Sequence, residues 1–406
     1  MKKRILLIAT LDTKGEEARY VKEIIESMGQ DVIVADTGIL DPPLIKADIP
    51  REEIAKAAGA DINQLAAARD EGKASLVMSE GLTKIATKMY ERGEIAGIIG
   101  MGGTWGTSTC AAVMRAFPVG VPKVLVSTIA ARDIRPIIGT KDIAMIYSVA
   151  DIAGLNRITK KVLANAASAV AGMVSLSRPR EEQKPLVGMS TTGVQFPCAI
   201  RVKKILEEKG FEVVIFHAVG SGGRALETLV REGDVDTGVI DLAMQEIYST
   251  LFDLGSPFDA GADRLEAPAI RGLPHVIVPG CADFMSIVPG RVPPKLEKYK
   301  MHMHNPSVIV VKMEKEDVKM LAKFISEKVN KAPEKKVVIV PTQGFSSFDK
   351  LGHAAGFHDP EIRRTFIAEL KKLLDPSVKY IEVDAHVNDP EFAEVVAKVF
   401  LDIVKR

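Results

Sequence analysis

At 406 residues the chain is too long for one ordinary hydrophobic core, so two domains of about 200 residues each are expected. Its formal net charge of +1 at pH 7 creates no overall field toward nucleic acid or an anionic membrane, and we expect neither as a partner. The cysteines Cys110, Cys198 and Cys281 are scattered and odd in number, which fits a reducing cytoplasm and argues against a disulfide framework.

The first apolar run, at residues 4–10, superficially resembles the core of a signal peptide. The run is short, and Asp12, Lys14 and Glu16 follow it without a small-residue cleavage site, so we interpret it as a buried strand. No uncharged apolar run reaches the roughly 20 residues needed to span a bilayer. The chain is therefore expected to be cytoplasmic.

Apolar, β-branched runs alternate with helical stretches along the chain. This alternation is typical of mostly parallel sheets with helices on both faces, so we expect an α/β fold with two Rossmann-like domains. In the first half, strands are predicted at residues 4–10, 31–36, 97–100, 123–127 and 143–147. Helices are predicted at residues 14–28, 54–58, 76–92, 107–117 and 153–176.

A polar segment bracketed by Pro179 and Pro185 is the best linker, and it predicts domains at residues 1–178 and 185–406. In the second half, strands are predicted at residues 186–190, 212–217, 237–242, 275–279, 307–311, 336–341 and 379–383. Helices are predicted at residues 197–209, 223–231, 315–328, 359–374 and 390–405. Residues 254–272 and 288–306 lack periodicity and are expected to be functional or mobile loops.

A glycine-rich segment follows the third predicted strand, at the sheet edge where open α/β sheets bind ligands. Gly102, Gly103 and Gly106 let the backbone approach an anion, and the helix predicted next offers free N–H groups and the positive end of its dipole. Thr104 and Thr107 add hydroxyl donors. The segment is interpreted as a phosphate cradle. The alternative is a tight turn in which Thr107 caps the helix.

This segment does not match the two familiar phosphate-binding fingerprints. It has no P-loop lysine, and its third glycine comes one residue too late for the dinucleotide pattern. The next strand ends at Ser127 with no carboxylate for a ribose, so ATP is expected ahead of NAD. Ser127, together with Asp36 and Thr37 after the second strand, remains a candidate contact for the nucleotide or its metal.

The end of the first strand carries Thr10, Asp12, Thr13 and Lys14 as candidate nucleotide contacts. Thr13 and Glu16 have the spacing of a capping box, which puts Lys14 in the first helical turn, where a cation is unfavourable unless a phosphate lies beside it. Asp12 is a candidate Mg²⁺ ligand, because Mg²⁺ prefers one or two carboxylates plus phosphate oxygens. The alternative is that Asp12 only stabilises the turn and Lys14 is a solvated charge.

A resemblance to the tomato mosaic virus resistance protein-like ATP-binding family extends over essentially the whole chain. It is carried by residues 9–14, 35–38, 100–107, 190–193, 217–223, 279–283 and 341–347. The resemblance implies two Rossmann-like domains, ATP with Mg²⁺ in the first, and a tendency to form a homodimer. A small residue is expected where Trp105 stands; the tryptophan either stacks on a base or packs at a dimer seam.

Turns rich in glycine and hydroxyl groups also follow strands of the second half. The candidates for a small anionic metabolite are Thr191, Thr192 and Gly193; Gly220, Ser221, Gly222 and Gly223; and Thr342, Gln343 and Gly344. Such turns suit a carboxylate or phosphate. The alternatives are plain turn geometry and, for the last segment, an apolar staple of Phe345 and Phe348. His302 and His304 alternate, so on a strand both would face one side, but two histidines are weak evidence for a metal.

All seven histidines lie in the second half, which points to chemistry there. The catalytic candidates are His217, Cys198, Cys281 and Asp283. Cys198 is expected near a helix start, where the pKa of a thiol is lowered. Two cysteines at strand ends are a feature of cofactor-independent racemases; the alternative is that both are small buried apolar residues.

Three functions fit these observations. The first is an ATP-dependent enzyme acting on a small anionic metabolite at an interdomain cleft. The second is a non-catalytic nucleotide-binding regulatory or interaction module, which the missing P-loop lysine slightly favours. The third is a cysteine-pair racemase or isomerase that needs no nucleotide.

Overall fold

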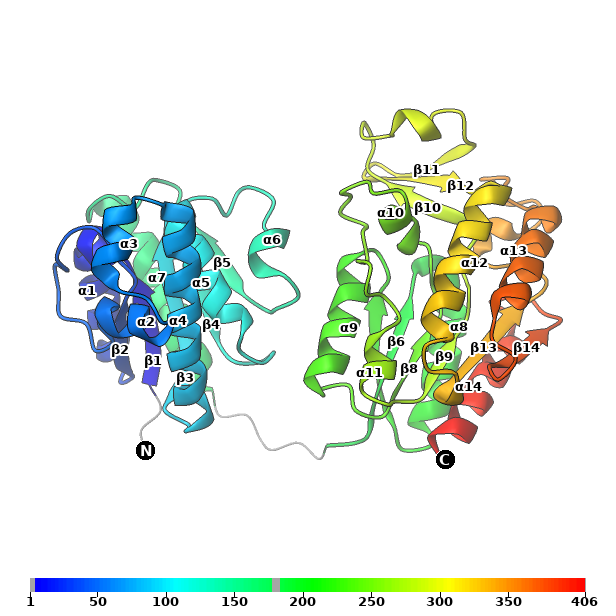
Figure 1. Cartoon of the computed structure of the whole chain (residues 1–406), viewed down its shortest axis with the longest axis horizontal. Coiled ribbons are helices and arrows are strands. Elements are labelled where there is room, and N and C mark those ends of the chain that lie inside the picture. The colour runs from blue at the N-terminus through cyan, green and yellow to red at the C-terminus, as the bar shows by residue number, and fades with distance from the viewer. Residues whose placement is uncertain (1–3, 177–182, 406) are drawn as a thin grey trace. The chain divides into compact units, whose positions relative to one another are not determined.

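The computed structural model describes residues 4–176 and 183–405. The chain divides into two compact units, Met1–Arg180 and Glu181–Arg406. Each unit contains its own parallel sheet with helices on both faces, as the alternation of apolar and helical segments predicts (Figure 1).

The first unit is built on a sheet of five parallel strands. Along the chain these are β1 (Arg4–Ala9), β2 (Asp31–Asp36), β3 (Ile95–Gly102), β4 (Lys123–Ser127) and β5 (Ala144–Tyr147). Their order across the sheet is β2-β1-β3-β4-β5, so the chain leaves β1 on one side and returns to β3 on the other. In open α/β sheets, ligands bind beyond the carboxyl ends of the strands at such a reversal of strand order.

Helices cover both faces of this first sheet (Figure 1). One core is shared by α2 (Arg51–Ala57), α3 (Ile62–Ala68), α4 (Glu71–Glu91) and α5 (Thr104–Arg115), and the other by α1 (Leu11–Ser27) and α7 (Arg157–Ser175); the short α6 (Arg135–Ile138) follows β4. Side chains along β1 alternate between the cores, so Leu6 and Ile8 enter one while Ile5 and Leu7 enter the other. Burial on both faces explains why the strand is a continuous apolar run.

The second unit repeats this topology with one further strand. Its six parallel strands are β6 (Leu186–Thr191), β7 (Glu212–His217), β8 (Gly238–Asp241), β9 (His275–Ile277), β13 (Lys336–Pro341) and β14 (Lys379–Val383). Their order is β14-β13-β9-β8-β6-β7, so its first five strands follow the order of the first sheet. The strand order reverses here between β6 and β8.

The faces of the second sheet are also both covered. On one face lie α8 (Phe196–Glu207) and α14 (Pro390–Val404), which share a core with Val187 and Ile339. On the other lie α12 (Lys315–Val329) and α13 (Pro360–Leu373), with α9 (Ser221–Glu232) over β8. Two short helices, α10 (Ile247–Leu251) and α11 (Ala267–Ile270), lie between β8 and β9 along the chain.

A separate antiparallel sheet was only partly predicted. It consists of β10 (Phe284–Ile287), β11 (Met301–Asn305) and β12 (Val308–Lys312), in the order β10-β12-β11. The strand at residues 307–311 was expected, whereas β11 lies in a segment that we interpreted as a loop. The His302 and His304 rings both lie near Phe348, with centroid distances of 6.4 and 5.8 Å, so their placement on one strand face is confirmed.

Candidate functional site

A pocket of about 260 Å³ lies in the first unit where the strand order reverses. Its walls come from the segments that follow β1, β2 and β3 and from the start of α4. The lining residues are Thr10, Asp12, Thr13, Lys14, Gly38, Ile39, Leu40, Glu71, Gly102, Gly103, Thr104, Trp105 and Gly106. The fold thus brings together most of the residues that the sequence predicts as nucleotide contacts.

The turn from β3 into α5 depends on close backbone packing. A Cβ added to Gly102 would lie 2.8 Å from the Cα of Gly106, and one added to Gly106 would lie 3.1 Å from the carbonyl oxygen of Met101. At Gly103 the nearest atom to an added Cβ would be Thr128 Oγ1, at 3.9 Å. Because α5 begins at Thr104 with Gly103 as an N-cap that has no side chain, the amides of its first turn are available to a ligand.

The start of α1 also faces this pocket, and its N-cap residue makes no side-chain cap, although the amide of Leu11 donates to Asp36. The helix begins at Leu11, and Thr10 is its N-cap. The predicted capping box of Thr13 and Glu16 is wrong, since the Thr13 hydroxyl lies 2.9 Å from the Thr10 hydroxyl instead. The backbone at Lys14 departs from helical geometry, with φ −126° and ψ 20°, so α1 kinks after its first turn.

Two acidic side chains stand at the carboxyl ends of β1 and β2. Asp36 Oδ1 accepts hydrogen bonds from the amides of Leu11 at 3.0 Å and Gly38 at 2.9 Å, and Asp12 Oδ2 accepts one from Leu40 at 3.1 Å. The other oxygens, Asp36 Oδ2 and Asp12 Oδ1, are buried and have no partner among the described residues. Burial, with a smaller contribution from the charge of Asp12, raises the pKa of Asp36. The site therefore has unused acceptors that suit a donor or a cation.

Four of the predicted nucleotide contacts are not lining residues: Asp36, Thr37, Thr107 and Ser127. The Thr107 hydroxyl is fully buried, 2.7 Å from Ser127 Oγ and 3.2 Å from the carbonyl of Gly102. Thr37 is also fully buried, and its hydroxyl has no partner among the described residues. Thr107 does not cap α5 either, since that position belongs to Gly103. Thr107 and Ser127 instead hold the ends of β3 and β4 together.

One wall of the pocket is apolar. It includes Trp105, Ile39 and Leu40, and the indole N–H of Trp105 donates to the carbonyl of Glu71 at 3.0 Å. That bond fixes the ring against the start of α4. Ile39 and Leu40 were not predicted, because apolar residues after a strand carry no ligand signature.

The glycine-rich turn of the second unit is filled by an anion that the chain itself supplies. Where α9 begins, Glu246 Oε2 accepts the amide of Gly220 at 2.6 Å, and a Cβ added to Gly223 would collide with Glu246 Oε1. The metabolite site predicted at Gly220, Ser221, Gly222 and Gly223 is therefore already occupied by a carboxylate. Glu246 was not predicted, because its contact with Gly220 spans 26 residues of the sequence.

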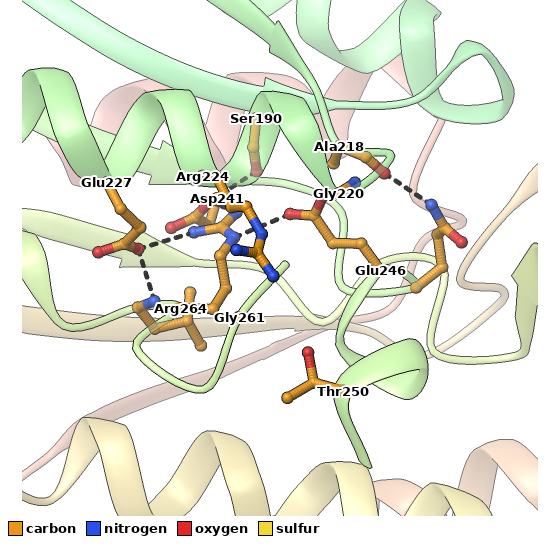
Figure 2. Close-up of polar contacts among 12 residues, drawn as sticks. Ser190, Ala218, Gly220, Arg224, Glu227, Asp241, Glu246, Thr250, Gly261 and Arg264 are labelled. Carbon is orange, nitrogen blue, oxygen red and sulfur yellow. Dashed lines mark hydrogen bonds and ion pairs between the residues drawn. The ribbon is translucent and has the colours of Figure 1, made fainter. Parts of the chain in front are cut away.

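Glu246 belongs to a buried ionic cluster centred on Arg264 (Figure 2). The guanidinium donates to Glu246 Oε1 at 2.9 Å, to Glu227 Oε1 at 3.2 Å and to Asp241. Burial by itself would lower the pKa of Arg264. The neighbouring carboxylates outweigh burial and hold this pKa well above its ordinary value. The cluster anchors part of the segment 254–272, which we had interpreted as a functional or mobile loop.

The cysteines do not support acid–base chemistry. Cys198 and Cys281 are 1% and 0% exposed and lie in different cores. Burial raises the pKa of Cys198 to about 12 and the pKa of Cys281 well above its ordinary value. The lowered thiol pKa predicted for Cys198 is therefore wrong, because desolvation outweighs the effect of a helix start.

Asp283 is a buried acid with an unusual titration. The Ser346 hydroxyl donates to its Oδ2 at 2.6 Å, while its Oδ1 has no partner among the described residues. Burial and the nearby charge of Asp349 raise the pKa of Asp283 to about 7. Arg363 pairs with Asp349 at 2.6 Å, so its charge is bound to Asp349 and not to Asp283.

A second pocket, of about 130 Å³, lies where the strand order of the second unit reverses. Its lining residues are Thr192, Gly193, Val194, His217, Val219, Gln245, Phe258, Phe284, Ser286, His304, Asn305, Val308, Val310 and Phe348. Three sequence-predicted residues, Thr192, Gly193 and His217, meet here. Gln245, which the sequence analysis missed, follows β8 at the same sheet edge.

The other predicted metabolite contacts are used within the fold. Thr191 is buried at the end of β6. Thr342 and Gln343 donate to Asp384, and Gly344 packs against His386. These residues are not lining residues of the second pocket. Phe345 and Phe348 are both buried but belong to different cores, so the alternative of a staple built from the two is not supported.

Metal and membrane features are sparse in the part of the chain that the structure describes. There, no group of three or more His, Cys, Asp or Glu side chains is arranged to hold a metal ion. A metal at Asp12 would thus need further ligands, such as phosphate oxygens.

No helix within residues 4–176 and 183–405 combines the length and apolarity required to cross a membrane.

Two family models match the chain, one in each unit. Residues 3–179 match the N-terminal domain, and residues 184–404 the C-terminal domain, of the "Uncharacterised protein family (UPF0261)". The chain belongs to the UPF0261 family. A UPF0261 protein of Clostridium tetani is 38% identical over the full length of both chains, and one of Mesorhizobium japonicum is 34% identical over 99% of this chain and 100% of its own.

The tomato ToMV resistance protein Tm-1 is a further relative of this UPF0261 chain. It is 33% identical over 98% of this chain, which spans 56% of the length of the tomato protein. The resemblance to the tomato mosaic virus resistance protein family is thereby confirmed. Among solved structures, the Streptomyces sp. SF2575 glycosyltransferase SsfS6, complexed with thymidine diphosphate, covers 98% of this chain and 99% of its own, with 12% identity and a TM-score of only 0.19.

Proposed function

We propose that the first unit of this UPF0261 protein binds ATP, through its phosphates and with Mg²⁺, in the pocket between the ends of β1 and β3. The observation that carries the proposal is the start of α5, which faces the pocket without a side-chain cap and lies beside the start of α1. Helix starts present free amides and positive partial charge, which attract phosphate groups. Lys14 adds a full positive charge to the same lining.

The shape of the pocket supports a nucleotide rather than inorganic phosphate. The indole of Trp105 and the side chains of Ile39 and Leu40 give it an apolar wall, beside the polar turn at Gly103 and Thr104. Nucleotide bases stack on aromatic rings, whereas free phosphate makes no use of such a wall. A ligand with a polyanionic end and a flat apolar end fits both parts.

The acceptors in the pocket suit Mg²⁺. Asp12 Oδ1 is buried without a partner among the described residues, and it belongs to a lining residue. Asp12 would hold the ion together with phosphate oxygens, and the bound ion would offset the phosphate charge. Lys14 and the amides of α5 then orient the phosphates.

A cytoplasmic location accompanies this proposal. Cys110, Cys198 and Cys281 are all free and buried. Free thiols without any disulfide fit a compartment that keeps cysteines reduced.

Calorimetric titration of the full chain with ATP, ADP and NAD, each with and without Mg²⁺, tests the proposal. ATP with Mg²⁺ is expected to bind most tightly, and at 100 times its Kd it should stabilise the fold by about 2.7 kcal/mol. If none of the nucleotides binds, the proposal fails. Phosphate release measured in the same samples separates an enzyme, which turns ATP over, from a binding module, which does not.

Gly103 offers a substitution that separates binding from folding. As the N-cap of α5, with φ −73° and ψ −157°, it tolerates a side chain, and both Asp and Asn are good caps. Gly103→Asp is expected to keep or raise the stability of the fold while its charge repels phosphates. Gly103→Asn, of the same shape without the charge, is the matched control and should bind ATP more tightly than Gly103→Asp.

A further inference from the structure

We propose that the second pocket, between the ends of β6 and β8, binds a small monocarboxylate that carries a hydroxyl group. The pocket is at the topological position in its unit that the nucleotide pocket has in the first unit. Its volume of about 130 Å³ resembles the ~150 Å³ of a cavity known to hold benzene, so its ligand is small. The inference does not depend on nucleotide binding in the other unit.

The requirement for a hydroxyl group comes from Gln245. This lining residue is 1% exposed, and its Nε2 donates to the carbonyl of Ala218 at 2.6 Å. That bond fixes which end of the amide is oxygen, because the reverse orientation would set two oxygens against each other. Gln245 Oε1 has no partner among the described residues. A buried acceptor of this kind calls for a donor, and a ligand hydroxyl or ammonium group supplies one.

The charges around the pocket select an anion with a single charge. The chain turns at Thr192 and Gly193 into the helical turn η1 (Gly193–Gln195), which has no side-chain cap and leads into α8. His217 and His304 are the titratable lining residues, and the described lining contains no Asp, Glu, Lys or Arg. An ammonium group would therefore meet no counter-charge, and a phosphate dianion would meet no permanent cation. A carboxylate instead meets backbone amides and imidazoles.

The remaining lining accommodates a short carbon skeleton. Phe284 and Phe348 are 3% exposed and pack edge to face with a centroid distance of 4.9 Å, and Val310 is 2% exposed beside them. This apolar wall is built from the antiparallel sheet and the segment after β13. A ligand with a carboxylate, a hydroxyl group and a few carbon atoms satisfies all three parts of the pocket.

Three compounds of three carbons each separate these requirements. Lactate has both polar groups, propionate lacks the hydroxyl group, and 1,2-propanediol lacks the carboxylate. In calorimetric titrations of the full chain, lactate is expected to bind about tenfold more tightly than propionate, and the diol not to bind. Equal affinities for lactate and propionate, or for lactate and the diol, would overturn the proposal. So would the absence of binding by lactate, glycerate and 3-hydroxybutyrate together.

Two variants link the binding to this pocket. A Cβ added to Gly193 meets no atom within 4 Å, so Gly193→Val extends into open space beside the pocket and is expected to abolish lactate binding with the fold intact. Gly172→Val, in α7 of the other unit, is equally open and should bind lactate normally. Gln245→Met is expected to remove the preference for lactate over propionate. If Gly193→Val binds lactate as the unmodified chain does, the ligand lies elsewhere and the assignment is wrong.

Discussion

Glu246 Oε2 accepts a 2.6 Å hydrogen bond from the amide of Gly220, so the first turn of α9 carries its own carboxylate. The start of α5 in the first unit contrasts with this arrangement, because it has no side-chain cap; in α1, by comparison, the amide of Leu11 donates to Asp36. A helix start that is neutralised internally offers little to a ligand, whereas an open one attracts anions. This difference is why we assign the polyanionic ligand to the first unit.

Replacing Lys14 by Met should weaken ATP binding. Loss of a charge-assisted hydrogen bond is worth about 1.5–3 kcal/mol, or roughly 10- to 150-fold in Kd. Lys22→Met on the same helix removes a cation that pairs with Glu26 at 3.7 Å, outside the pocket lining, and should leave the Kd unchanged. Calorimetry on both variants measures the difference, and equal Kd values would exclude a role for Lys14.

Asp12→Asn should uncouple ATP binding from Mg²⁺. The amide can keep the hydrogen bond from Leu40 but supplies no carboxylate for the ion. We expect Mg²⁺ to tighten ATP binding in the unmodified chain and in Glu23→Gln, an exposed position further along α1, but not in Asp12→Asn. A Mg²⁺ effect that survives in Asp12→Asn would mean that other groups hold the metal.

Thr107→Val should lower stability without affecting ATP binding. The hydroxyl is buried against Ser127 Oγ, and its loss leaves a buried polar group without its partner, which costs about 1–3 kcal/mol. Chemical denaturation measures the stability, and calorimetry the affinity. If a stably folded Thr107→Val bound ATP more weakly, Thr107 would contact the nucleotide, as the sequence suggested.

Arg264→Met should be severely destabilising. The substitution leaves Asp241, Glu246 and Glu227 as buried acids without their shared cation, and breaking a buried ion pair costs about 3–5 kcal/mol. Arg201→Met is the matched control, because it breaks only an exposed pair with Glu394, worth about 1 kcal/mol at most. Denaturation midpoints that move equally in both variants would show that the cluster contributes no special stability.

The stability of the fold should depend on pH through Asp283. Its pKa is raised from 3.8 to about 7, so between these values the folded chain binds more protons than the unfolded chain. The free energy of unfolding therefore falls as the pH rises through this window. Asp283→Asn is expected to flatten the decline between pH 5 and pH 7, as measured by thermal unfolding, whereas Asp402→Asn at an exposed site should not. Identical slopes in all three proteins would contradict the assignment.

Much of the fold follows from local pattern. The strands at Asp31–Asp36 and Lys336–Pro341 lie where the sequence predicts them, because strands buried on both faces are unbroken apolar runs between turns. The strand Met301–Asn305 was missed, since it is largely exposed and alternates methionine with histidine instead of forming an apolar run. Such a strand is stabilised by pairing with its neighbour, which a local pattern does not reveal.

Site residues could be predicted from the sequence where a local backbone turn defines their role. They could not be predicted where their role depends on a partner that is distant in the sequence. Gly102 and Gly103 were recognised because a run of glycines between a strand and a helix is a local sequence signal. The roles of Thr107 and Gly220 were misjudged because their partners, Ser127 and Glu246, are distant in the sequence. Only the folded chain shows whether a hydroxyl or an amide is already satisfied.

Trp105 gives the nucleotide pocket a built-in optical reporter. It is the only tryptophan of the chain, it belongs to the pocket lining, and its indole is tethered to Glu71. Its fluorescence therefore arises from this one location, undiluted by emission from other indoles. Occupancy of the pocket is thus open to rapid-mixing measurements on the unlabelled protein.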